Sequence, residues 1–295
     1  MTKTLYRCLL WLLPAGLLVL WLFFPLGGRT NILLLGLDRR PGEGDMVRAD
    51  AIMVITARPT GANEPALGLF SIPRDLYLPI PEQGENRINT AHFFGELDRP
   101  GSGPERTAAA ITQNFDIPMD GWVRLDFAAF VGLIDAVGGL EINAPKPVFD
   151  YAYPTQDYGT MTLEIPAGWQ QMSGERALQY ARSRHGSSDF DRAERQQLVV
   201  QALIRKLAAP SFWPRLPVFY NAFTRLVDSN LSFPQLARLG LAALRVGPDG
   251  VQRLVIDQDW VTPFTTPAGA AVLSPRWELI RPAAKEMFDL PSRVP

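Results

Sequence analysis

Cysteine and histidine are scarce in this sequence of 295 residues, and each scarcity excludes a class of site. The only cysteine is Cys8, so no disulfide can form within the chain. His92 and His185 are the only histidines, too few for a zinc site with the usual three or four histidine and cysteine ligands. Any bound metal is therefore expected to be a hard cation held by carboxylate oxygens.

Lysine is also rare, because the 29 basic residues divide into 4 lysines and 25 arginines. A GC-rich genome explains such a bias without any function, whereas guanidinium groups that bind phosphate through two hydrogen bonds explain it through a site. The formal net charge of −1 gives no electrostatic reason to expect nucleic acid as a partner. The sequence also lacks both common glycine-rich phosphate loops, so nucleotide binding through them is unsupported.

Charge is absent from Cys8 to Gly28, a run of 21 mainly apolar residues. As a helix, a run of this length reaches roughly 31 Å and crosses a hydrocarbon core of roughly 30 Å. A cleaved signal peptide is the alternative, but its apolar region is usually shorter and ends in a small-residue cleavage site, which is not apparent. We expect residues 1–28 to form a short cytoplasmic tail and a transmembrane signal-anchor. Residues 29–295 would then be the extracytoplasmic catalytic domain of a single-pass cell membrane protein.

Short apolar runs predict buried strands at 31–37, 51–57, 66–72 and 251–256. Helical patterns follow at 127–137, 174–182, 193–207, 234–245 and 276–287. Asp126 is the predicted N-cap of the first helix, and Gly138 is its predicted stop. The alternation predicts an α/β fold, a single layered α/β/α domain around a mixed central sheet. Residues 145–166, rich in tyrosine and proline, are expected to form a loop that covers a site.

Two carboxylates flank the predicted turn between the first two strands. Asp38 follows the first strand directly, and Asp50 precedes the second. In α/β folds, ligands bind outside the carboxyl ends of the strands, where two acids can converge on a divalent cation. A pair of unrelated surface acids in turns is the alternative that spacing alone leaves open.

Arginines follow the next strand. Pro73 ends that strand and presents Arg74 beside Asp75, while Arg87 comes shortly afterwards as a further cation. An Arg–Asp pair on the surface of a turn would show the same pattern.

A second group of basic residues lies between 180 and 197. Arg182 and Arg184 are expected to share one face of an extended segment, where they would clamp two phosphates. Arg192 and Gln196 lie four residues apart and share one face of the next predicted helix. A solvated basic surface remains the alternative for both clusters.

The predicted helix at 127–137 carries an apolar stripe that includes Phe130 and Ile134. Core packing is the ordinary role of such a stripe. A groove for a lipid tail beside the arginines would need the same kind of surface.

The order of these motifs resembles the LytR–CpsA–Psr family. The resemblance runs from about Asn31 to Gln197 and rests on the segments LLLGLDRR, SIPRD, RINTAHFFG, DAVGG, YARSRH and DFDRAERQQ. It implies an enzyme of cell wall biogenesis. Such an enzyme takes a glycopolymer from a polyprenyl pyrophosphate-linked carrier and joins it through phosphate to a peptidoglycan acceptor.

The resemblance also assigns roles to residues. It implies that Asp38 and Asp50 hold Mg²⁺, or Mn²⁺ in its place. It implies that Arg74, Arg182, Arg184, Arg192 and Gln196 contact the pyrophosphate, with Arg39 and Arg87 as weaker candidates. The helix with Phe130 and Ile134 would border the lipid. Asp75 or a metal-binding acid would be a possible general base, unless a loose transition state needs none.

Three positions depart from the family pattern. Arg87 stands where lysine is usual, Ala49 replaces a serine or threonine before Asp50, and Asp191 replaces a glycine before Arg192. Two other activities stay open: a pyrophosphatase that uses water as acceptor, and a lipid-binding envelope regulator without catalysis.

Overall fold

The computed structural model describes Gly16 and residues 28–39, 44, 46–58, 67–155, 159–184, 188–246 and 250–288. The predicted anchor at 1–28 therefore lies outside the described residues, apart from Gly16 and Gly28. Within the described ranges, no helix combines the length and the apolar character that crossing a bilayer requires.

A six-stranded mixed sheet forms the centre of the fold, with strand order β11-β6-β1-β2-β3-β12. Its strands are β1 (Thr30–Leu37), β2 (Ala49–Ala57), β3 (Leu67–Ser71), β6 (Gly121–Leu125), β11 (Asp228–Ser229) and β12 (Gln252–Val255). β6 runs parallel to β1, and β12 runs parallel to β3, whereas β2 is antiparallel to both β1 and β3. The carboxyl ends of β1, β3, β6 and β12 consequently meet at one edge of the sheet, beside the start of β2.

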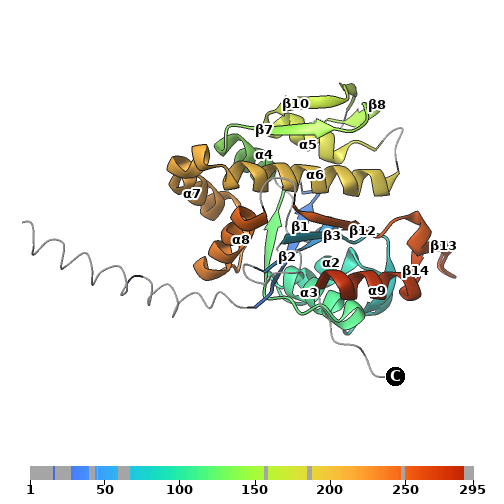
Figure 1. Ribbon diagram of the computed structural model, residues 1–295. Coiled ribbons are helices and arrows are strands. Elements are labelled where there is room, and N and C mark those ends of the chain that lie inside the picture. The colour runs from blue at the N-terminus through green and yellow to red at the C-terminus, as the bar shows by residue number, and fades with distance from the viewer. Residues whose placement is uncertain are drawn as a thin grey trace, which may run out of the picture.

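Helices cover both faces of this sheet, as Figure 1 shows. One face packs against α2 (Thr90–Asp98), α3 (Gly103–Phe115) and α9 (Trp277–Phe288). The other face packs against α6 (Asp189–Ala208) and α8 (Phe233–Val246). Alternate strand residues supply the two cores: Leu33 and Leu35 belong to the first, whereas Met53 and Leu69 belong to the second. The predicted α/β class with a mixed central sheet is confirmed.

A smaller layer lies beyond α6. It contains α4 (Phe127–Ala136), α5 (Gly174–Arg182) and two antiparallel strand pairs. One pair joins β7 (Leu140–Ala144) to β10 (Gly168–Met172), and the other is the hairpin of β8 (Val148–Pro154) and β9 (Thr160–Ile165). The prediction of a loop at 145–166 is wrong, because the segment alternates inward and outward side chains as a strand pair does. Tyr153 and Leu163, for example, are buried beneath it.

The remaining elements lie at the periphery. They are two hairpins, β4 (Tyr77–Ile80) with β5 (Gly84–Arg87) and β13 (Val261–Thr265) with β14 (Ala271–Pro275), the short helices η1 (Pro210–Arg215) and η2 (Gln258–Trp260), and the helix α7 (Leu216–Leu226).

Local signals set the ends of the helices near the sheet edge. The Asp126 side chain accepts a hydrogen bond from the Ala129 amide at 2.9 Å, and Gly138 has a φ of +78° just beyond α4, as the sequence predicts. The helix α6 begins four residues earlier than predicted. Ser188 and Asp191 form a capping box there, and this pair stabilises the additional turn.

Candidate functional site

The two predicted acids and Arg74 lie close together at the edge of the central sheet where β1 and β3 end. Asp38 follows β1, Asp50 is the second residue of β2, and Arg74 lies in the turn after β3. Because β1 and β2 are antiparallel neighbours, the end of one lies beside the start of the other. The sheet topology therefore brings together residues that lie up to 36 positions apart in the chain.

Asp50 is the centre of this group. One carboxylate oxygen lies 2.8 Å from Arg74 Nη1, and the other lies 3.1 Å from Arg184 Nη2. Three adjoining cavities all have Asp50 in their walls. The three cavities therefore share this carboxylate as a common part of their walls.

Arg74 contacts three carboxylates. Besides Asp50, its guanidinium lies 3.5 Å from Asp75 and 3.4 Å from Asp189. Burial lowers the pKa of Arg74, but attraction to Asp50 and to the other two carboxylates outweighs it, so the pKa is raised. Arg74 is thus a fixed positive charge in the polar cavity between β3 and α6.

Arg182 links the acids to the apolar part of the site. Its Nη2 lies 3.3 Å from Asp38, and its Cζ lies 4.2 Å from the centroid of the Phe127 ring. The prediction that Arg182 and Arg184 share a face of an extended segment is wrong. Arg182 is the last residue of α5 and Arg184 lies beyond the helix end, so each arginine reaches a different acid.

Asp150 of β8 holds the segment between these two arginines. Its carboxylate is almost fully buried and accepts hydrogen bonds from the Ser183 hydroxyl and the Arg184 amide, both at 3.0 Å. The sequence gives no signal for Asp150, because an acid in a predicted loop does not reveal a partner 34 residues away.

Arg192 is the most deeply buried cation of the site, with 6% of its surface exposed. Its Nη1 lies 3.0 Å from Asp189 yet has no partner in hydrogen-bond geometry. Burial, together with the nearby charges of Arg184 and Arg74, lowers the pKa of Arg192 to about 10, although Asp189 opposes the change. A buried guanidinium N–H without a hydrogen-bond acceptor is a donor that an oxygen of an anionic ligand would satisfy.

The neighbours of Arg192 on α6 have other roles. Gln196 lies one turn on and borders both the apolar cavity and the polar one. Arg195 donates to the backbone oxygens of Tyr180 and Ser183, at 2.9 Å and 2.5 Å, and so fixes the end of α5. The predicted shared face of Arg192 and Gln196 is confirmed, because both line the same two cavities.

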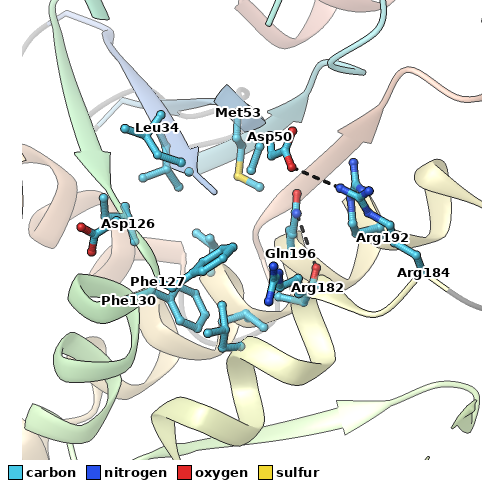
Figure 2. A pocket seen from close by; sticks show the side chains of 18 residues that line it. Leu34, Asp50, Met53, Asp126, Phe127, Phe130, Arg182, Arg184, Arg192 and Gln196 are labelled. Atoms are coloured by element: carbon cyan, nitrogen blue, oxygen red, sulfur yellow. Dashed lines mark hydrogen bonds and ion pairs between the residues drawn. The ribbon is translucent and has the colours of Figure 1, made fainter. Parts of the chain in front are cut away.

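An apolar pocket extends from these polar groups between the sheet, α4 and α6. Its cavity volume is about 110 Å³, and its apolar wall includes Leu34, Met53, Phe127 and Phe130. Figure 2 shows the two phenylalanine rings on one side and Asp50, Arg184 and Arg192 on the other. Phe130 lies where it was predicted. The prediction for Ile134 is wrong, because its side chain is buried in the core beneath α4 and does not line the pocket.

Two weaker candidates lie outside the three cavities. Arg39 forms an ion pair with Asp126 at 2.5 Å. Arg87 lies 3.4 Å from Asp75 and donates to the Ala271 carbonyl at 2.7 Å. Asp75 consequently lies between Arg74 and Arg87, at the wall of the polar cavity.

The carboxylate of Asp191, one of the departures from the family pattern, is bonded at the start of α6. Its carboxylate accepts hydrogen bonds from the Ser188 amide and hydroxyl, at 2.7 Å and 2.6 Å, and these bonds lower its pKa. Its negative charge is therefore used in capping α6.

Asp38 and Asp50 border one open cavity and offer oxygen ligands. Within the described residues, no group of three or more histidine, cysteine or acidic side chains converges as a metal site would require. Two carboxylates suit Mg²⁺, because this ion usually keeps several waters and binds through one or two carboxylates plus phosphate oxygens. The donor set thus fits a cation that binds together with a phosphorylated ligand.

Comparison with known proteins finds relatives that align with about 70% of this chain. The chain is 31% identical over 212 residues to the polyisoprenyl-teichoic acid–peptidoglycan teichoic acid transferase TagU of Oceanobacillus iheyensis, covering 71% of this chain and 61% of the relative. It is 31% identical over 232 residues to the probable cell wall biosynthesis protein LcpB of Corynebacterium glutamicum, covering 72% and 51%. The aligned region is thus less than two thirds of either relative.

Solved structures share the fold. The crystal structure of Bacillus subtilis TagV has a TM-score of 0.70 at 22% identity, covering 90% of this chain and 98% of that one. The structure of TagT bound to LIIa-WTA has a TM-score of 0.70 at 23% identity, covering 90% and 93%. The model of the LytR_cpsA_psr family matches residues 26–272, which include every residue of the site. This chain therefore belongs to the LytR–CpsA–Psr family.

Proposed function

We propose that this chain transfers a glycopolymer from a polyprenyl pyrophosphate carrier to peptidoglycan through a phosphate linkage. The single observation that carries the proposal is the junction of an apolar pocket with a group of arginines. Arg182, Arg184 and Arg192 line the polar end of the same pocket whose other wall contains Phe127 and Phe130. A ligand with a greasy chain attached to a strongly anionic group matches such a junction.

The unsatisfied N–H groups of the site support an anionic ligand. Arg192 Nη1 and Arg74 Nε are both buried and have no partner in hydrogen-bond geometry, although each lies within ion-pair distance of a carboxylate, Asp189 at 3.0 Å and Asp75 at 3.5 Å. Leaving buried donors unpaired costs roughly 1–3 kcal/mol each, more for charged groups. Pyrophosphate oxygens would accept hydrogen bonds from these donors. Part of the binding energy of the substrate would then come from its phosphates.

The ion pairs of the site would rearrange when the substrate binds. Arg74 and Arg184 now neutralise Asp50, and Arg182 neutralises Asp38. In the complex, the arginines would turn to the phosphate oxygens, and the two carboxylates would then be available to a cation. Mg²⁺, or Mn²⁺, held by Asp38 and Asp50 would supply additional positive charge beside the phosphates.

The reaction would be an attack by an acceptor hydroxyl on the phosphorus that bears the glycopolymer. A new oxygen–phosphorus bond forms, the bond to the bridging oxygen breaks, and polyprenyl phosphate leaves. Arg74, Arg182 and Arg184 would stabilise the charge that develops on the phosphoryl and leaving oxygens. Asp75, at the wall of the polar cavity, is the candidate to accept the hydroxyl proton.

The named relatives agree with this reaction class. TagU is by its name a transferase of teichoic acid from a polyisoprenyl carrier to peptidoglycan, and TagT has been solved with LIIa-WTA bound. On this proposal, the domain at 29–295 acts outside the cytoplasm, where peptidoglycan lies, and residues 1–28 anchor it in the membrane.

Purified full-length chain, polyprenyl pyrophosphate-linked glycan and peptidoglycan fragments test the proposal, with and without Mg²⁺. We expect a phosphate-linked product and released polyprenyl phosphate. Arg74→Ala should lower the rate by roughly 10²–10³, the loss typical of a removed charge-stabilising group. Arg276→Ala removes an exposed arginine that is paired with Glu278 and lines none of the three cavities, so it should leave the rate unchanged.

The acceptor separates the proposal from its nearest rival. A pyrophosphatase would release polyprenyl phosphate equally well without peptidoglycan, because water would replace the sugar hydroxyl. Full transfer by the Arg74→Ala chain would show that the site lies elsewhere.

A further inference from the structure

A second apolar surface lies on α7 and α8, outside the pocket. Seven large hydrophobic residues of these helices are between 38% and 63% exposed. Besides Val218 and Leu226 of α7, there are five: Leu216, Tyr220, Phe233, Leu241 and Leu244. The rings of Tyr220 and Phe233 meet edge to face with their centroids 6.3 Å apart, which joins the two helices into one surface. We call these five residues the α7–α8 surface.

The helix α8 is apolar on two sides. Leu239, Ala242 and Ala243 pack against the sheet, as the helix requires in order to cover it. Leu241 and Leu244 follow Phe233 by 8 and 11 residues, so they share its side of the helix, opposite the packed face. A helix that only covers a sheet needs one apolar stripe, so folding does not explain the second one.

The charged residues within the segment that carries this surface are almost all positive. Residues 209–246 contain four arginines and one acid, Asp228, whose carboxylate is paired with Arg124 at 2.5 Å. Arg215 and Arg225 are exposed on or beside α7. Exposed aromatic and leucine side chains with arginines at their margin are the composition of a helix that lies in the headgroup region of an anionic bilayer.

The start of the sheet lies beside the same helix. The Thr30 hydroxyl, at the first residue of β1, accepts a hydrogen bond from Arg238 of α8 at 3.3 Å. The uncharged run of residues 8–28 ends two residues earlier, and two residues span at most about 7 Å. An apolar run thus joins the folded body next to an exposed apolar helix, and both can enter the same membrane.

We propose that the α7–α8 surface docks the folded domain onto an anionic lipid bilayer. The helices that carry this surface also pack against residues that line the apolar pocket. Leu34 and Leu125 line that pocket and belong to the same hydrophobic cluster as Phe219, Phe223 and Leu239 of α7 and α8. Docking would therefore place the pocket one layer of side chains from the lipid, while the acids and arginines stay at the far end of β1. This inference goes beyond the proposed reaction and does not require it.

Full-length chain reconstituted into vesicles tests the docking. In a Cys8→Ser background, Leu244→Cys and Leu241→Cys each carry an environment-sensitive fluorophore. Leu97→Cys is the matched control, because Leu97 is 57% exposed on α2, across the sheet. In vesicles of phosphatidylcholine with phosphatidylglycerol, we expect blue-shifted emission and quenching by nitroxide-labelled lipid at 244 and 241, and neither at 97.

If Arg215 and Arg225 contact lipid headgroups, docking should depend on anionic lipid. Removing phosphatidylglycerol should reduce the quenching, and Arg215→Gln and Arg225→Gln should each weaken the docking equilibrium about fivefold. Circular dichroism of each labelled chain verifies that it is folded.

Two outcomes would overturn the docking proposal. The first is aqueous emission at 244 and 241, equal to that at 97. The second is a blue shift without quenching by the lipid label, which would mean that protein covers the surface, either residues 8–28 or a second copy of the chain. Equal quenching in the two lipid mixtures would overturn the requirement for anionic lipid.

Discussion

The guanidinium carbon of Arg182 lies 4.2 Å from the centroid of the Phe127 ring, so the charged and apolar halves of the site meet at one contact. Arg182 ends α5 and Phe127 begins α4, so the contact depends on how these two helices pack. On the proposed function, it marks the position where the pyrophosphate would join its lipid.

Phe127→Ala should weaken binding of the lipid-linked substrate. The substitution removes part of the pocket wall and the ring beneath Arg182, a contact worth about 0.5–2 kcal/mol. We expect kcat/KM to fall about tenfold, mainly through KM. Phe149→Ala is the control, because Phe149 is an exposed aromatic residue of β8. Steady-state kinetics with the polyprenyl substrate measure both variants, and an unchanged KM for Phe127→Ala would contradict the placement of the lipid.

Arg192→Met should stabilise the ligand-free chain while abolishing its activity. Burial of this guanidinium is poorly compensated, as its pKa lowered to about 10 indicates. Replacing such a charge with an apolar side chain of similar size should raise the free energy of unfolding by about 1–3 kcal/mol. Urea denaturation measures this change.

Arg195→Met provides the comparison within the same helix. Arg195 is equally buried, but it satisfies the Tyr180 and Ser183 carbonyls. Its loss leaves those oxygens without that donor and should destabilise the chain by about 1–3 kcal/mol. The same sign of change in both variants would refute the distinction between a ligand-binding and a structural arginine.

Asp150→Ala should impair the site indirectly, because Asp150 positions the segment with Arg182 and Arg184 and does not itself bind the substrate. The change removes the acceptor for the Ser183 hydroxyl and the Arg184 amide, so the segment that orients Arg182 and Arg184 loosens. We expect a loss of about 1–3 kcal/mol in stability and a lower kcat. Asp150→Asn retains one acceptor oxygen and should recover part of both. Glu141→Ala, at an exposed position of β7, should change neither.

Asp126→Asn should show how much the negative charge of the α4 N-cap contributes to stability, because asparagine keeps the capping hydrogen bond but carries no charge. Burial raises the pKa of Asp126, but the hydrogen bond from the Ala129 amide and the interaction with Arg39 together lower the pKa by more than burial raises it. The pKa therefore falls below its ordinary 3.8. Because the folded-state pKa is depressed, the charge stabilises the fold above pH 3.8 and loses that effect as the pH falls through the lower folded-state value. Asparagine remains a good N-cap.

Thermal unfolding of both chains measures this pH dependence. The wild-type chain should be more stable than Asp126→Asn at neutral pH, and the difference should vanish in acid below the depressed pKa. A difference that persists unchanged at low pH would mean that the ion pair with Arg39 contributes nothing.

Several features of the fold follow from short stretches of sequence. The strands β1, β2 and β3 and the helices α4, α5, α8 and α9 lie within two residues of their predicted bounds. Apolar runs, the Asp126 cap and the glycine at 138 are local signals, and they act within one or two turns of chain. The sequence does not predict the hairpin of β8 and β9, because proline and tyrosine are common in loops, whereas cross-strand burial decides the structure there.

The sequence by itself determined which groups are available: carboxylates at strand ends, many arginines, and hardly any thiols, imidazoles or lysines. Only the tertiary structure decided their partners. Arg74 contacts Asp50 and Asp189, which are 24 residues before it and 115 after it. Arg182 lies against Phe127, and Ile134 is buried away from the pocket. Chemical character belongs to each residue, whereas proximity depends on strand order and on the packing of helices across the sheet, which no local pattern encodes.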